Sequence, residues 1–80
     1  MEGPDVNQAR MDTYDVLMVL GETYEKEGMK GGPTAVQQLM VAERLYRLAR
    51  TEVNGTYRQP IAQRSFIRVR GVLDDMRLPA

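Results

Sequence analysis

The stretch from Thr34 to Val53, TAVQQLMVAERLYRLARTEV, has the apolar spacing of a long amphipathic helix and decides the fold. When successive residues are placed about 100° apart, one half of this helix carries most of the large apolar side chains. That half consists of Ala35, Leu39, Val41, Ala42, Leu45, Tyr46, Leu48, Ala49 and Val53, with Gln38 and Glu52 among them. An apolar arc this wide lets a helix pack against two neighbours. We therefore expect a central core helix in which Leu39 and Leu45 are buried.

Both ends of this helix are marked in the sequence. Pro33-Thr34 precedes it, and Gln37 follows Thr34 at the spacing of a capping box, in which side chains bond free backbone N–H groups. Asn54-Gly55 follows the last periodic residue, and such a pair readily takes the left-handed conformation that ends a helix. The predicted helix therefore covers residues 34–53.

Two further segments, at about residues 5–27 and 60–77, are helix-periodic, and each has a proline at or near its start. Proline suits the first turn of a helix, where its missing N–H would have no partner. The joints, at residues 28–32 and 54–57, are short enough to make neighbouring helices antiparallel. The sequence thus predicts one all-α domain over residues 1–80, a small three-helix unit with antiparallel helices that self-associates.

Three features leave alternatives open. The segment from Tyr14 to Leu20 also resembles a buried strand, although no second strand of similar quality is available to pair with it. The alternation in residues 67–70 resembles a strand too, with Asn54-Gly55 as a hairpin turn. Asp12-Thr13 would suit a second N-cap, which would break the first helix near residue 11. The helical pattern explains more residues in each case, so we expect helices.

The first predicted helix carries two apolar stripes. The wider stripe, which we expect to face the core, consists of Val6, Ala9, Val16, Leu17, Leu20 and Tyr24. A second stripe, about 100° away, consists of Met11, Tyr14 and Met18. The polar half of the central helix carries two more apolar residues, Val36 and Met40. A three-helix domain has no obvious interior for these five side chains, so we expect them to bind a protein partner. The alternative is that the first helix is simply buried on two sides.

The composition argues against catalysis. The chain has no cysteine, histidine or tryptophan, which excludes the common zinc sites and the Ser/His/Asp and Cys/His nucleophile systems. Ser65 is the single serine, lies in the apolar stripe of the third helix and is expected to be a packing residue. Asp12, Asp15 and Glu22 could share a face for a hard cation, but a solvated acidic surface explains them better. We expect a non-enzymatic protein without a metal or cofactor.

The charges are unevenly distributed although they cancel overall. Residues 1–30 carry a net charge of −4, and residues 31–80 carry +4. The arginines of the second and third helices recur every three or four residues and predict a basic surface made of Arg44, Arg47, Arg50, Arg64 and Arg68. Arginine binds phosphates and carboxylates with two parallel hydrogen bonds. A nucleic-acid-binding helical module that uses these arginines is therefore the alternative function.

The preferred prediction is a protein–protein interaction module. It would be an assembly subunit or a small effector that binds a larger protein through an apolar helical face flanked by arginines. The charge asymmetry favours assembly, because an acidic end of one copy can meet a basic end of the next. No secretory signal or membrane span is apparent, since the longest apolar run is Val16 to Leu20. We therefore expect a soluble cytoplasmic protein.

Overall fold

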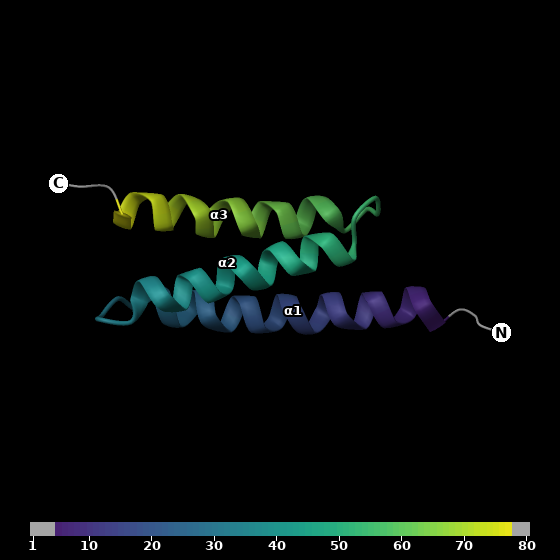
Figure 1. The fold of residues 1–80 in the computed structure, drawn as a ribbon, viewed down its shortest axis with the longest axis horizontal. Coiled ribbons are helices and arrows are strands. Elements are labelled where there is room, and N and C mark those ends of the chain that lie inside the picture. Colours follow the sequence, from purple (N-terminus) through teal and green to yellow (C-terminus); the bar gives the residue numbers. More distant parts are fainter. Residues whose placement is uncertain (1–4, 78–80) are drawn as a thin grey trace.

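The chain folds into three helices, α1 (Asp5–Met29), α2 (Ala35–Glu52) and α3 (Gln59–Arg77), in a computed structural model (Figure 1). The structure describes the backbone of residues 5–77 and the side chains of residues 8–76. The all-α prediction is confirmed, and each observed helix end within the described range lies within two residues of its predicted position. The segments that also resembled strands belong to the continuous helices α1 and α3, and α1 has no break near residue 11.

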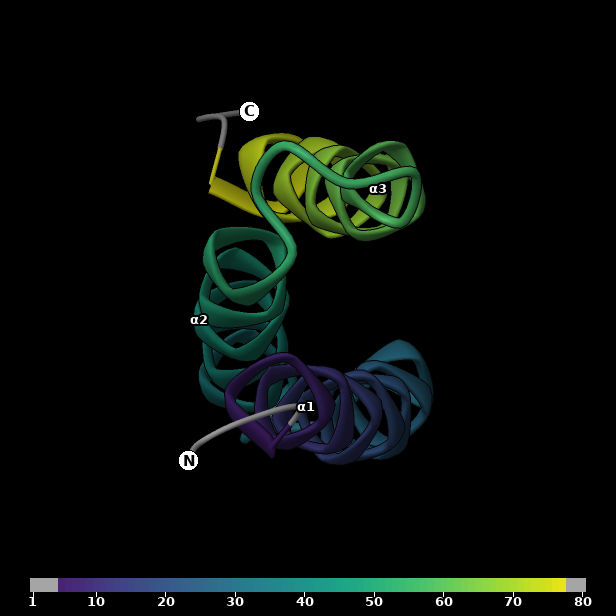
Figure 2. The same ribbon diagram turned by 90° about the vertical axis from the view of Figure 1, so that its right-hand side faces the viewer.

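The middle helix holds the other two together. Figure 2 shows α2 at the back of a C-shaped arrangement, with α1 and α3 as its two arms. Helix α2 packs along both neighbours, whereas α1 and α3 approach each other at few points. The result is an elongated molecule of 56 × 19 × 12 Å rather than a closed bundle.

The two turns use glycine where the backbone needs positive φ angles. Gly31 and Gly32, between α1 and α2, have φ values of 84° and 96°, and Gly55, after α2, has a φ of 82°. The predicted stop at Asn54-Gly55 is therefore confirmed. The predicted capping box is wrong, because Thr34 has a ψ of 8° and its side chain makes no capping hydrogen bond. An N-cap side chain reaches the first free N–H groups from an extended backbone, which Thr34 does not have.

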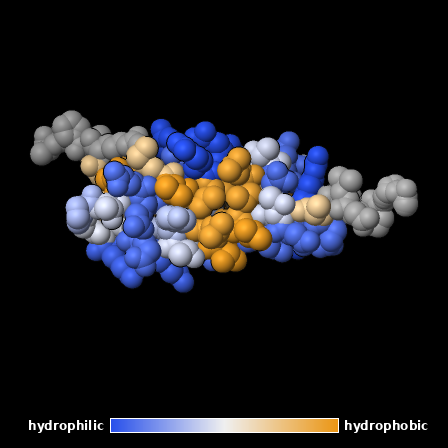
Figure 3. Space-filling model, turned by 60° about the horizontal axis from the view of Figure 1, so that its bottom comes forward, coloured by the Kyte–Doolittle hydropathy of each residue, from blue (hydrophilic) through white to orange (hydrophobic). Residues whose placement is uncertain are grey.

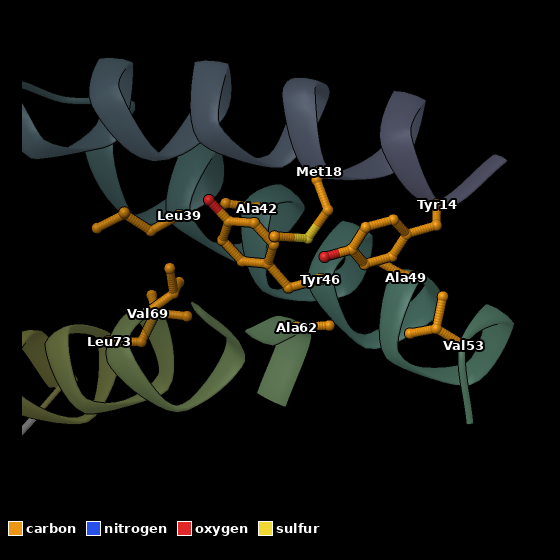
Figure 4. Close-up of a cluster of buried hydrophobic side chains, with 10 residues drawn as sticks. All are labelled: Tyr14, Met18, Leu39, Ala42, Tyr46, Ala49, Val53, Ala62, Val69 and Leu73. Carbon is orange, nitrogen blue, oxygen red and sulfur yellow. The ribbon is translucent and has the colours of Figure 1, made fainter. Parts of the chain in front are cut away.

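The core follows a regular seam along α2. Its buried positions, four and three residues apart in turn, are Ala35, Leu39, Ala42, Tyr46, Ala49 and Val53. Helix α1 adds Tyr14 and Met18, and α3 adds Ala62, Val69 and Leu73 (Figure 4). Spacing of four and three residues keeps the seam facing its partners as the helices wind past each other.

The phase of α1 differs from the prediction. The side chains expected to face the core are largely exposed, with 57% exposure for Val16, 42% for Leu20 and 39% for Tyr24. The side that packs on α2 instead contains Tyr14, Met18 and two glycines, Gly21 and Gly28. Glycine has no side chain, so these positions let the backbone of α1 come close to Tyr46 and Leu39 of α2. Close backbone approach, and not the widest apolar stripe, sets the rotation of α1.

The apolar arcs of α2 and α3 are only partly buried. Val41 and Leu48 of α2 are 39% and 49% exposed, and Leu45, which was predicted to be buried, is half-buried. Ile61 and Met76 of α3 are each 44% exposed. The open arrangement explains these values, because α2 has only two neighbours and α3 packs mainly on one.

Candidate protein-interaction surface

A continuous apolar area lies on the face of α1 that points away from α2. At its centre are Val16, Val19 and Leu20, and Val19 is 61% exposed. Figure 3 shows this face as one hydrophobic area in the middle of the molecule, with hydrophilic residues on both sides. We call Val16, Val19 and Leu20 the outer α1 face. Contiguous exposed apolar area of this kind commonly marks a site of contact with another molecule.

Helix α2 extends this area on one flank. Val41, Leu45 and Leu48 are four and three residues apart and therefore share one side of α2. Glu43 and Arg50, which bond residues of α3, lie on the opposite flank of the buried seam. The side chains of Val41 and Leu48 consequently lie on the flank turned away from α3, beside α1.

The outer α1 face is shallowly hollowed. An open hollow of about 280 Å³ is lined by Asp15, Val16, Val19 and Leu20. Its single titratable group is Asp15, whose Oδ1 lies 3.4 Å from Nη1 of Arg58. The surface that lines the hollow is apolar, which suits an inserted apolar side chain. A reacting substrate would need several converging polar groups to orient it.

Most of the predicted partner-binding residues lie elsewhere. Tyr14 and Met18 belong to the core, with exposures of 6% and 9%, and Met11 and Val36 are half-buried against it. The expectation that they lack an intramolecular partner is therefore wrong for these four residues. Met40 alone is exposed, at 38%. The close packing allowed by Gly21 and Gly28 turns the Met11, Tyr14 and Met18 stripe inward. Of the wider stripe, Val16, Leu20 and Tyr24 are exposed and Leu17 is half-buried, while the Val6 side chain lies outside the described residues.

Two of the five arginines predicted to form a basic surface are engaged within the chain. The Arg50 guanidinium donates to Gln63 Oε1 at 2.6 Å and stacks 4.8 Å from the ring centre of Phe66. Arg68 makes two bonds to the carboxylate of Glu25, at 2.7 and 2.8 Å.

The other three arginines, Arg44, Arg47 and Arg64, are exposed. Arg47 lies 6.0 Å from the Phe66 ring centre. None of the three forms an ion pair with a side chain that the structure describes. Free cations are thus fewer than the sequence suggested, and they are divided between α2 and α3.

Glu25 joins all three helices, and sequence reasoning did not find it. The Tyr46 hydroxyl of α2 donates to Glu25 Oε1 at 2.7 Å, and Arg68 of α3 bonds both carboxylate oxygens. The hydrogen bonds from Arg68 lower the pKa of Glu25, and the bond from Tyr46 acts in the same direction. Burial, followed by the bond to Glu25, raises the pKa of Tyr46 above its ordinary value. Residues 43 positions apart carry no local sequence signal for such a contact.

Oppositely charged parts of the chain form ion pairs with each other within the molecule. The acidic helix α1 meets the arginine-rich part of the chain through the pairs Asp15–Arg58 and Glu25–Arg68. These pairs link α1 to α3 and to the turn before it, although the two arms otherwise approach each other at few points. The overall charge asymmetry therefore gives less support to head-to-tail assembly than the sequence suggested.

The described part of the chain carries no sign of a metal site or of a membrane-spanning helix. Among the side chains that the structure describes, no group of three or more acidic residues is placed to hold a metal ion. None of α1, α2 and α3 combines the length and the apolar composition that crossing a bilayer requires. Comparison with protein-family models, curated proteins and solved structures finds no match for this chain.

Proposed function

We propose that this protein is a non-enzymatic protein–protein interaction module that binds its partner through the outer α1 face. The main support for this proposal is the exposure of Val16, Val19 and Leu20 at the middle of α1, on the side opposite the buried contact with α2. Covering one large aliphatic side chain contributes roughly 1.5–3 kcal/mol. A partner that covers these three residues would therefore gain a substantial part of its binding energy from them.

The surroundings of this surface also suit a protein partner. Val41 and Leu48 extend the apolar area onto α2, and Arg44 lies on the surface of α2 three and four residues from them. Asp12 and Asp15 lie beside the area on α1. An apolar centre with charged residues at its edge is the usual composition of a protein–protein contact.

The nucleic-acid alternative has weaker support. A phosphate-binding surface needs several free cations on one side of the molecule. Arg50 and Arg68 are bonded within the chain, as are Arg58 and Arg70, which pair with Asp15 and with Glu43. Four of the seven arginines between residues 44 and 70 are therefore engaged within the chain, and Arg44, Arg47 and Arg64 are left to support this alternative.

Site-specific photo-crosslinking in the cell that makes the protein tests the proposal. A photoreactive benzophenone side chain is placed at Val16 in one variant and at Ile67 in a matched control, since the two positions are 57% and 56% exposed. We expect a discrete crosslinked protein from position 16, lost when Leu20→Glu is added, and none from position 67. The same products from both positions, or none from position 16, would contradict the proposal.

A further inference from the structure

We infer that the partner of the outer α1 face is a second copy of this chain, with the two α1 helices antiparallel about a two-fold axis near Val19. This inference rests on the proposed function and names its partner. It is based on the charged residues around the apolar centre of α1. A partner must pair with these charges as well as cover the apolar side chains.

Asp12, Val19 and Lys26 recur at intervals of seven residues on the exposed side of α1. Seven residues bring a helix back to nearly the same side, about 20° short, and about 10 Å further along the axis. One flank of the outer α1 face therefore carries an acid, a valine and a base in a row, with the valine at the midpoint.

This row is complementary to itself when reversed. In an antiparallel pair centred on Val19, each Asp12 lies at the same level and on the same flank as Lys26 of the other copy. Two symmetric ion pairs then enclose the apolar contact, as a two-fold interface requires. A parallel two-fold pair would place the two rows on opposite flanks and at unreversed levels, so Asp12 of one copy could not meet Lys26 of the other.

Two of the neighbouring charges are engaged within the chain. Asp15 is bonded to Arg58, and Lys30 is bonded to Glu27 at 2.9 Å. Asp12 and Lys26 form no ion pair with a side chain that the structure describes. Asp12 accepts one hydrogen bond from Gln8 at 3.0 Å, and Glu22, four residues before Lys26, is also exposed. Asp12, Glu22 and Lys26 are thus the charges that this part of α1 offers to another molecule.

The apolar surface also suits a symmetric contact. The hollow between Val16, Val19 and Leu20 lies beside the proposed axis, so an aliphatic side chain from each copy can enter the hollow of the other. The formal net charge is zero, so long-range repulsion does not oppose association. A chain of 80 residues has a small core, and a second copy would enlarge it.

Sedimentation equilibrium of the full chain over a wide concentration range tests the inference at the apolar centre. We expect a monomer–dimer equilibrium. Val16→Glu should raise its dissociation constant by at least about 100-fold, because it places a charge in a desolvated contact. Ile67→Glu, at an equally exposed position of α3, should leave the constant unchanged. Circular dichroism verifies that both variants remain helical.

Charge exchange tests the antiparallel register. Asp12→Lys alone and Lys26→Glu alone should each weaken the dimer about tenfold at low salt, because like charges then face each other at both ends. A mixture of the two single variants should form a heterodimer as tight as the wild-type dimer. The double variant should also recover wild-type affinity, because it restores opposite charges at both ends of the antiparallel contact.

The outcomes separate this inference from the proposed function. A wild-type chain that stays monomeric at millimolar concentration overturns the self-partner. Crosslinking from position 16 to a different protein would then still support the interaction module. A dimer that is insensitive to Val16→Glu also overturns the inference, since its interface lies elsewhere. A double variant as weak as the single variants rules out the antiparallel register.

Discussion

A Cβ atom on Gly21 would lie 2.7 Å from Cε1 of Tyr46, closer than real Cβ atoms approach a ring. Gly21 stands in the interior of α1, where glycine normally costs about 1 kcal/mol relative to alanine. Its presence there is explained by the ring of Tyr46, which occupies the space of the missing side chain. The contact sets how close α1 and α2 lie and which side of α1 faces inward.

Gly21→Ala should therefore lower the free energy of unfolding, by about 1–3 kcal/mol, because the added methyl group forces Tyr46 to shift. Gly71→Ala is the matched control, since a Cβ at this exposed position of α3 meets no atom within 4 Å. That variant should be stabilised by about 0.5–1 kcal/mol through helix propensity. Urea denaturation measures both changes. Midpoints that shift in the same direction would contradict the packing of α1 on α2.

The three helices were predictable because the chain marks their ends locally. Proline near each start and glycine in each joint act on the backbone of a few adjacent residues, so they can be identified without knowing the tertiary structure. Gly55 illustrates this, since its positive φ follows from its place after the last periodic residue of α2. The apolar side of α2 was predictable too, although only one edge of that arc is fully buried.

The rotation of α1 was not predictable from apolar content. Counting large side chains favours the stripe with Val16 and Leu20, whereas packing favoured the side on which backbones can approach. One sequence signal could have shown this. Gly21 and Gly28 are seven residues apart, and α2 carries small residues at the same interval, at Ala35, Ala42 and Ala49. Small residues at matching intervals on antiparallel helices indicate a close contact, and the candidate interaction surface then follows as the opposite face.

Adjacent substitutions on α1 test its phase. Met18→Glu should cost more than about 3 kcal/mol, because it buries a carboxylate without a partner in the core. Val19→Glu, one residue along the helix, should change the free energy of unfolding of the monomer by less than about 1 kcal/mol, since Val19 is 61% exposed. Thermal melts followed by circular dichroism, at concentrations where the chain is monomeric, rank the two variants. The reverse order would mean that α1 is rotated.

Leucines of α2 should differ in the same way. Leu39 is fully buried, and Leu39→Ala should cost about 2–5 kcal/mol through lost burial and an internal cavity. Leu48 is 49% exposed, so Leu48→Ala should cost less than about 1 kcal/mol in the monomer. Chemical denaturation measures these differences, with the same dependence of the free energy of unfolding on denaturant concentration assumed for all variants. Equal losses would contradict the observed burial along α2.

The contact between Glu25, Tyr46 and Arg68 lies beyond sequence reasoning for a physical reason. Its members come from three helices, and each looks like an ordinary surface or core residue in its own periodic pattern. Only the close packing of α1 on α2 brings the Tyr46 hydroxyl to the carboxylate of Glu25, whose side chain is 14% exposed.

This contact should make the free energy of unfolding depend on pH in the acidic range. The hydrogen bonds from Arg68 and Tyr46 lower the folded-state pKa of Glu25 below 4.5. The ionised Glu25 carboxylate therefore contributes fully to the free energy of unfolding above pH 4.5. This contribution is lost as the pH falls through the folded-state pKa. Glu25→Gln should therefore cost about 1–2 kcal/mol near pH 7, and its difference from the wild type should shrink below pH 4.5. Glu27→Gln, which removes an exposed pair with Lys30, should cost less than about 0.5 kcal/mol. Urea titrations between pH 7 and about pH 3 give both curves. A Glu25→Gln difference that stays constant over this range would show that the carboxylate is not held as its contacts indicate.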